Sequence, residues 1–227
     1  MKDTLFISDI HLGDPDFEDE EKLDLLFTGR SWAAIYILGD LIDTWESTIA
    51  LIIAKYMPLI KVINEVAKIT SVNIIKGNHD PDVWTLARFF PNAHIFDYTH
   101  KVFIGGKSVI MAHGEKMDPL NPYLYFLAWL YRKMKAKFDE TTILRKITEW
   151  ISSKFYGISK KPWAVQDRNA VKEWKDEAEV IITGHTHTVK MLEMSNLIYI
   201  NTGTVLPPVK TYVIHNGQTG RFEIHKL

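Results

Sequence analysis

The sequence predicts an α/β fold with a layered, open β-sheet, and two observations carry this prediction. Short apolar runs rich in β-branched residues, which are typical of buried strands, alternate with longer amphipathic segments. Five of the strand-like runs lead into residues that can bind a metal ion. Ligands gathered at the carboxyl ends of strands are characteristic of open α/β sheets. We therefore expect a single domain over residues 1–227, with its site at that edge of the sheet.

The composition limits what this site can be. The 227-residue chain has no cysteine, which excludes disulfides and thiolate zinc sites, so a metal must take oxygen and imidazole ligands. The formal net charge of -1 argues against a globally basic nucleic-acid binder. Residues 1–7 are too short and too quickly acidic for a signal peptide, and no apolar run approaches the roughly 20 residues that span a bilayer. We expect a cytoplasmic protein.

Two predicted strands near the N-terminus deliver the first candidate ligands. Residues 4–7 form the first strand and lead to Asp9 and His11, which could hold one metal ion from one side. A helix-entry loop with an aspartate cap is the alternative here. Residues 33–38 form the second strand and end shortly before Asp40, whose two carboxylate oxygens can bridge a pair of cations.

Two helices and a third strand follow the same pattern. Six acidic residues between positions 14 and 21 surround the start of an amphipathic segment, where they complement the helix dipole. A second helix over residues 49–67 places apolar residues on one face, and Pro58 should kink it. Residues 72–75 form the third strand and lead to Asn78, a neutral ligand that lets a site hold two cations without excess negative charge.

The middle of the chain predicts three more strands. Residues 94–96 and 101–104 form two of them, and Gly105-Gly106 forms a hairpin turn after the second. Residues 108–112 then form a strand that ends at His113. This is the fourth strand end that carries a candidate ligand.

The fifth strand end carries two histidines. Residues 180–182 form a buried β-branched strand, and Gly184 lets the backbone turn sharply into His185 and His187. In an extended segment, residues two apart share a face, which suits two imidazoles that reach a pair of metal ions. Pairs of this kind also occur as ordinary surface residues or in sites for one metal.

Five motifs in this order resemble the signature of the calcineurin-like metallophosphoesterases. They are Asp9-Ile10-His11, Gly39-Asp40-Leu41-Ile42-Asp43, Gly77-Asn78-His79-Asp80, His113-Gly114 and Gly184-His185-Thr186-His187. The resemblance implies a four-layer αββα sandwich with a dinuclear metal centre. It also implies manganese as the first expectation for the two divalent ions, with iron, zinc, cobalt or magnesium as alternatives.

The resemblance further implies a role for each motif residue. Asp9, His11 and His187 would bind one cation, Asn78, His113 and His185 would bind the other, and Asp40 would bridge them. A hydroxide between the cations would attack phosphorus in line.

Two residues of these motifs would act on the leaving group rather than on the metals. His79 would protonate or stabilise the leaving oxygen, and Asp43 would orient its imidazole. The alternative for Asp43 is a loop cap. Asp80 could equally be a helix cap and does not belong to the predicted catalytic set.

Residues 118–177 differ in composition and predict an inserted helical cap subdomain. An aromatic run over residues 123–131 is followed by a basic stretch. Between Arg132 and Lys175 the sequence has 12 Lys and Arg residues and only 5 Asp and Glu residues. Such a surface suits a phosphate on an apolar or stackable group: a lipid-linked nucleotide, an anionic membrane surface touched peripherally, or single-stranded nucleic acid. The alternative is an ordinary helical hairpin with packed aromatics and solvated lysines.

These features predict a metal-dependent phosphohydrolase that acts on a phosphodiester, pyrophosphate or phosphomonoester. The expected partner is a phosphorylated substrate that is lipid-linked or a nucleotide.

The layout resembles the UDP-2,3-diacylglucosamine hydrolases, which cleave a pyrophosphate. His79 departs from them, because they usually carry Arg there. General phosphodiesterases and Mre11-like nucleases carry His, so a DNA nuclease is the alternative. A scaffold that binds metal without catalysis is a third hypothesis. The sequence does not indicate the oligomeric state.

Overall fold

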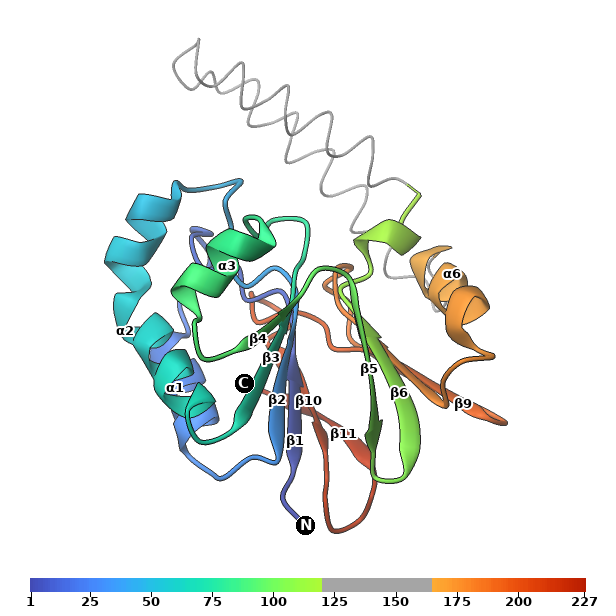
Figure 1. Ribbon diagram of the computed structural model, residues 1–227. Coiled ribbons are helices and arrows are strands. Elements are labelled where there is room, and N and C mark those ends of the chain that lie inside the picture. Colours follow the sequence, from blue (N-terminus) through green and yellow to red (C-terminus); the bar gives the residue numbers. More distant parts are fainter. Residues whose placement is uncertain (120–164) are drawn as a thin grey trace.

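Two β-sheets packed between helices make up the computed structural model, which describes residues 1–119 and 165–227 (Figure 1). The first sheet has the order β11-β10-β1-β2-β3-β4. Its strands are β1 (Thr4–Ile7), β2 (Ala34–Leu38), β3 (Ser71–Ile75), β4 (His94–Phe96), β10 (Thr211–His215) and β11 (Phe222–Lys226). Strands β1 to β4 are parallel, β10 pairs antiparallel with β1, and β11 pairs antiparallel with β10.

The second sheet has the order β5-β6-β7-β9-β8. Its strands are β5 (Thr99–Ile104), β6 (Lys107–Ala112), β7 (Val180–Thr183), β8 (Lys190–Met194) and β9 (Leu197–Asn201). The central strands β6, β7 and β9 are parallel, and the two outer strands are antiparallel to their neighbours.

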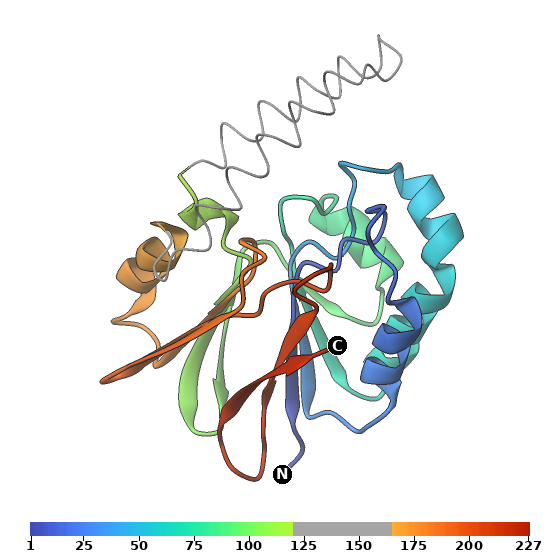
Figure 2. The same ribbon diagram turned by 180° about the vertical axis from the view of Figure 1, so that it is seen from behind.

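Helices cover the outer face of each sheet, as the two opposite views show (Figures 1 and 2). The helices are α1 (Glu20–Thr28), α2 (Ile49–Ala67) and α3 (Val83–Phe89) on the first sheet, and α6 (Val165–Trp174) on the second. The layers therefore run helix, sheet, sheet, helix. The predicted four-layer αββα sandwich is confirmed.

Strand β1 shows why the predicted strands read as continuous apolar runs. All four of its residues are buried. Leu5 and Ile7 pack in the core beneath α1 and α2, while Phe6 packs in the core between the two sheets. A strand with both faces covered has no polar side, so its sequence shows no alternation.

The second helix bends where the sequence predicts a kink. Helix α2 has non-helical torsion angles at Tyr56, two residues before Pro58, with φ -106° and ψ 18°. Proline removes an amide donor and clashes with the preceding turn, which accounts for the bend. Among the described helices, none is both long enough and apolar enough to cross a membrane.

Strands β8, β10 and β11 were not predicted from the sequence. The end of β9 falls in Ile200-Asn201-Thr202-Gly203-Thr204, which resembles the closing strand and turn of the calcineurin-like family. Strands β8 and β11 are the outermost strands of their sheets, and each has exposed positions. An edge strand half open to solvent lacks the apolar run that marks a buried strand. The predicted cap falls mostly on residues 120–164, which lie outside the described residues.

Candidate metal centre

The five predicted strand ends meet at one edge of the sandwich, the upper end in Figures 1 and 2. Strands β1, β2 and β3 are parallel neighbours in the first sheet, and β6 and β7 are parallel neighbours in the second. The loops that follow them bring together all nine residues predicted for the site. These are Asp9, His11, Asp40, Asp43, Asn78, His79, His113, His185 and His187.

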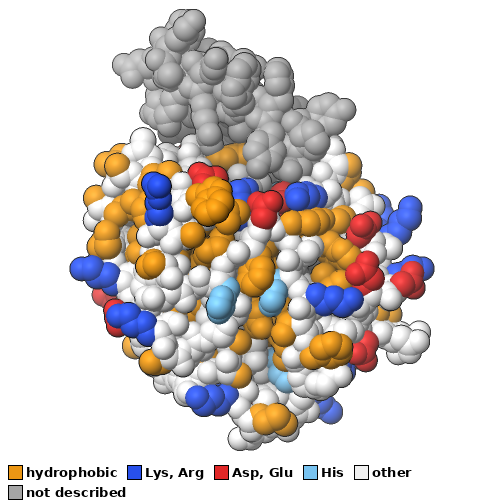
Figure 3. Space-filling view, viewed as in Figure 1, with side chains coloured by type: hydrophobic (Ala, Val, Ile, Leu, Met, Phe, Trp, Pro, Cys, Tyr) orange, Lys and Arg blue, Asp and Glu red, His pale blue; other side chains and the backbone are white. Residues whose placement is uncertain are grey.

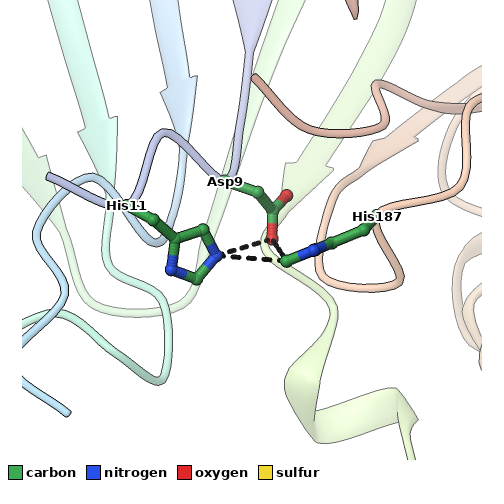
Figure 4. Close-up of side chains that lie close together, drawn as sticks. All are labelled: Asp9, His11 and His187. Atoms are coloured by element: carbon green, nitrogen blue, oxygen red, sulfur yellow. Dashed lines mark hydrogen bonds and ion pairs between the residues drawn. The ribbon is translucent and has the colours of Figure 1, made fainter. Parts of the chain in front are cut away.

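One group consists of Asp9, His11 and His187, whose side chains point toward one another (Figure 4). His187 Nε2 lies 3.2 Å from Asp9 Oδ1 and 3.1 Å from His11 Nε2. Asp9 Oδ1 is buried, yet it accepts no hydrogen bond. A buried carboxylate oxygen of this kind, facing two imidazole nitrogens, fits a divalent cation with oxygen and nitrogen ligands.

A second group consists of Asp40, His113 and His185. His113 Nε2 lies 3.1 Å from Asp40 Oδ2 and 3.1 Å from Asn78 Oδ1. His113 Nδ1 donates to the carbonyl oxygen of Leu38 at 2.8 Å, which directs the lone pair of neutral Nε2 at these two oxygens. Three acceptors facing one another repel unless a proton or a cation lies between them. This donor set therefore also fits a metal ion.

Asp40 lies between the two groups. Its Oδ2 atom is 3.1 Å from His113 Nε2 and 3.8 Å from His11 Nε2, so a single carboxylate oxygen faces one histidine of each group. Its Oδ1 atom accepts a hydrogen bond from the backbone N–H of His79 at 2.8 Å, which fixes the carboxylate. This placement suits a ligand shared by two cations.

The backbone at the site is strained in a repeated way. Five site residues adopt positive φ angles without being glycine: Asp9 (51°), His11 (53°), Asp40 (51°), His185 (71°) and His187 (53°). Left-handed conformations of such residues cost on the order of 1–3 kcal/mol each and persist where the surrounding structure imposes them, which is typical of functional sites. In these conformations the five side chains lie in the same small volume of the site.

Glycines before three of the ligands allow the loops to approach closely. A Cβ on Gly39 would lie 2.4 Å from His113 Nδ1, and one on Gly77 would lie 2.2 Å from Asp40 Oδ1. A Cβ on Gly184 would lie 2.5 Å from Asp9 Oδ2. Each glycine thus directly precedes one ligand in the chain and makes room for a ligand from another loop.

Asp43 connects the first group to His79. Its Oδ2 atom lies 2.8 Å from His11 Nδ1 and 3.0 Å from His79 Nδ1, while Oδ1 accepts from the backbone N–H of Trp45 and Glu46. The carboxylate therefore orients both imidazoles and is itself held by the loop. The alternative of a simple loop cap describes only half of its contacts.

The side-chain charges perturb one another strongly. Burial would raise the pKa of Asp9, but His187 and His113 lower it to about 2. The pKa of Asp40 lies well below its usual value, because His113 and His79 outweigh burial. Burial opposes the charged form of His113, yet Asp40 raises its pKa well above the usual value. These carboxylates therefore hold protons on neighbouring imidazoles, where a bound cation would take the place of the protons.

Asp80 is a site residue whose role was not predicted. It is buried, with Oδ1 accepting from the backbone N–H of Ile42 at 2.8 Å and Oδ2 from that of Gly77 at 2.9 Å. Burial and Asp40 raise its pKa to about 6. The alternative of a helix cap is wrong, since Asp82 caps α3 and accepts from the N–H of Thr85. Asp80 instead ties together the loops after β2 and β3.

Described residues at both ends of the segment 118–177 contact the site, and its C-terminal end includes α6, the helical layer on the second sheet. Asp118 Oδ2 lies 3.3 Å from His185 Nε2, and Gln166 on α6 donates to the carbonyl oxygen of Gly184 at 3.3 Å. Asp167 on α6 is buried and binds Lys190 Nζ at 2.6 Å. No sequence motif marks these residues, because their partners are distant in the chain.

The face of the molecule shown in Figure 3 carries intermingled acidic, basic and apolar side chains over its described part. Two of the exposed large apolar side chains of the molecule are Trp84 on α3, 82% exposed, and Phe103 on β5, 75% exposed. On this face, the described residues form no basic stripe of the kind expected for a backbone-tracking nucleic-acid binder.

Comparison with known sequences identifies relatives of this chain. The profile of the calcineurin-like phosphoesterase superfamily domain matches residues 3–220. The chain is also similar to a UDP-2,3-diacylglucosamine hydrolase from Shewanella piezotolerans, with 27% identity over 210 residues that cover 85% of each protein.

Comparison with solved structures gives matches over nearly the whole chain. YfcE, a phosphoesterase from E. coli, matches with a TM-score of 0.53 and 16% identity over 98% of each chain. An archaeal phosphodiesterase matches with 0.52 and 14% over 99% of each chain. Vps29 from Chaetomium thermophilum matches with 0.53 and 10%, covering 100% of this chain and 97% of its own. At these identities the similarity concerns the fold alone.

Proposed function

Because the chain belongs to the calcineurin-like phosphoesterase superfamily and is a metal-dependent phosphohydrolase, we propose that it hydrolyses a phosphodiester or pyrophosphate bond at a centre with two divalent cations. The observation that carries this proposal is the position of Asp40, whose Oδ2 atom faces His11 of one ligand group and His113 of the other. One carboxylate between two sets of nitrogen and oxygen donors is the arrangement that a shared ligand requires.

Seven residues would hold the cations. Asp9, His11 and His187 would bind one, Asn78, His113 and His185 would bind the other, and Asp40 would contact both. Oxygen and imidazole donors suit manganese first, with iron, zinc, cobalt and magnesium as alternatives. When bound, such a pair polarises phosphoryl oxygens and lowers the pKa of a water molecule that serves as the nucleophile.

The protein's own contribution to bond cleavage falls to His79. Its Nδ1 atom is held by Asp43 at 3.0 Å, and its Nε2 atom lies 4.0 Å from Asp40 Oδ2, so this second nitrogen faces the proposed metal centre. The side chain is 22% exposed and can meet a substrate. The carboxylates of Asp43 and Asp40 raise the pKa of His79 against the effect of burial, so the imidazole can carry the proton that the leaving oxygen needs.

The relative, rather than the site, supports a substrate class. The similar Shewanella piezotolerans protein is a UDP-2,3-diacylglucosamine hydrolase, which favours the pyrophosphate of a lipid-linked nucleotide for this chain too. The excess of basic residues between Arg132 and Lys175 supports an anionic substrate or a peripheral contact with an anionic membrane.

Hydrolysis of bis-p-nitrophenyl phosphate by the Mn²⁺-loaded protein tests the chemistry. Activity that disappears with EDTA and returns with Mn²⁺ is the expected result, and no hydrolysis with any divalent metal would contradict the proposal. The substrate class is tested separately, by comparing UDP-2,3-diacylglucosamine with UDP-N-acetylglucosamine. Both contain the same pyrophosphate, so faster release of UMP from the diacylated compound would identify recognition of the lipid.

A DNA nuclease is the second candidate, because His79 stands where Mre11-like nucleases carry histidine. Linear single-stranded and double-stranded DNA, incubated with the same Mn²⁺-loaded preparation, separate the two candidates. Cleavage of DNA with no hydrolysis of nucleotide-linked lipids would favour the nuclease.

A further inference from the structure

The indole ring of Trp45 stacks on the imidazole ring of His79. The two ring centroids lie 4.0 Å apart, and the planes are inclined by 24°. Trp45 lies in the same loop as Asp43, which holds His79 Nδ1. The backbone N–H of Trp45 donates to Asp43 Oδ1 at 2.8 Å. One short segment therefore supplies both the carboxylate and the aromatic ring that contact this imidazole.

A hydrogen bond by itself does not fix the plane of an imidazole. The contact from His79 Nδ1 to Asp43 Oδ2, 3.0 Å long, fixes one point of the ring, about which the ring can still pivot. The parallel indole face of Trp45 restrains that pivot. The ring of His11 adds an edge-on contact at 4.8 Å and 84°, but His11 also belongs to the candidate metal ligands.

The plane of the ring decides where its second nitrogen points. His79 Nε2 lies 4.0 Å from Asp40 Oδ2, on the side of the proposed shared ligand. Proton transfer to a leaving oxygen requires a heavy-atom distance of about 2.6–3.2 Å, so a modest rotation of the ring would move Nε2 out of reach.

On the premise of the proposed function, we infer that Trp45 is a positioning residue that holds His79 in the orientation needed to protonate the leaving oxygen. It touches neither the metals nor the phosphoryl group in this role. Its removal therefore affects the departure of a poor leaving group and spares the departure of a good one, which needs little protonation.

A matched pair of substrates separates this role from a merely structural one. Methyl phenyl phosphate and methyl p-nitrophenyl phosphate share the transferred group and differ in the leaving phenol. In the Mn²⁺-loaded enzyme, Trp45→Leu should lower kcat about 10- to 100-fold on the phenyl ester, which is part of the roughly 10²–10⁴-fold that general acid catalysis contributes, and less than about 3-fold on the nitrophenyl ester. KM should stay unchanged, and Trp45→Phe should restore most of the loss.

Trp84→Leu is the matched control, because Trp84 is 82% exposed on α3 and the same substitution there should change neither rate. In a His79→Ala background, Trp45→Leu should cause no additional loss. Equal losses on both esters, or a loss that persists without His79, would contradict the positioning role. If the wild-type enzyme hydrolyses neither ester with any metal, the proposed function itself fails. A wild type that is active, with Trp45→Leu at full activity on both esters, overturns only the role of Trp45.

Discussion

Asp40 and His113 come from different sheets, yet Asp40 Oδ2 and His113 Nε2 lie 3.1 Å apart. Asp40 follows β2 of the first sheet, and His113 follows β6 of the second. The contact therefore depends on how the two sheets pack, and the apolar core between the sheets holds the two halves of the candidate metal centre together. This core includes Phe6 and Met111.

Replacement of the shared ligand should affect both metal positions. We expect Asp40→Asn to reduce the metal content from two ions per chain to one or none and to lower kcat at least about 100-fold, because both cations lose a negatively charged ligand. Metal analysis of the purified variant, alongside kinetics, measures this. Asp16→Asn, at an exposed acid in the loop after β1, is the control and should keep both metals. Full metal content in Asp40→Asn would refute the shared-ligand role.

Loss of the proposed acid should reduce catalysis without loss of metal. If His79 supplies a proton and is not a ligand, as proposed, we expect His79→Ala to lower kcat by about 10²–10⁴ while two ions stay bound. His100→Ala serves as the control, since the ring of His100 packs on Phe96 and His100 is not one of the proposed site residues. A large loss of metal from His79→Ala would show that His79 is a ligand instead.

Two loops approach closely at Gly77, so a methyl group added there should be enough to disturb the site. A Cβ there would lie 2.2 Å from Asp40 Oδ1 and 2.4 Å from the Asp40 backbone nitrogen. We expect Gly77→Ala to push the loops apart, lower the melting temperature and reduce metal content. Gly106→Ala is the comparison, because a Cβ at Gly106 meets no atom within 4 Å, and its cost of about 1–2 kcal/mol comes from the positive φ alone. Equal melting temperatures for the two variants would contradict this steric effect.

The pKa shifts predict how pH affects the metal-free protein. The pKa of Asp9 is lowered from 3.8 to about 2, so its stabilisation is present above the unfolded value and disappears as pH falls through the folded value. The pKa values of His79 and His113 are raised above 6.5, so their stabilisation is present below that pH and disappears as pH rises through the folded values. The metal-free site should thus stabilise the fold most between about pH 4 and 6.5.

Metal binding displaces those protons, so it should be favoured by rising pH. We expect the increase in melting temperature caused by Mn²⁺, relative to EDTA-treated protein, to be larger at pH 8 than at pH 6. Thermal unfolding with and without metal at the two pH values checks this. An increase that is independent of pH would mean that the imidazoles hold no protons for the metal to displace.

Much of the fold and site could be predicted from the sequence because the information is local. A run such as residues 180–182 marks a strand buried on both faces, and the glycine and histidines after it mark a turn into a site. The nine motif residues come together because parallel strands end at the same edge. Whether the seven proposed ligands bind two ions stays a prediction.

Contacts between distant segments could not be predicted in the same way. Edge strands such as β8 and β11 show no apolar run, because one side faces solvent. The contact of Asp118 with His185 spans 67 residues and has no periodicity to reveal it. The stacking of Trp45 on His79 depends on how two loops meet, which only the packed structure shows.

The proposed pair of metal ions is tested most directly by titrating metal-free protein with Mn²⁺ at a protein concentration well above the dissociation constant, while measuring hydrolysis of bis-p-nitrophenyl phosphate. We predict that activity rises to a plateau at two equivalents of Mn²⁺ per chain. A plateau at one equivalent, or full activity in the presence of EDTA, would contradict a dinuclear centre shared by Asp40.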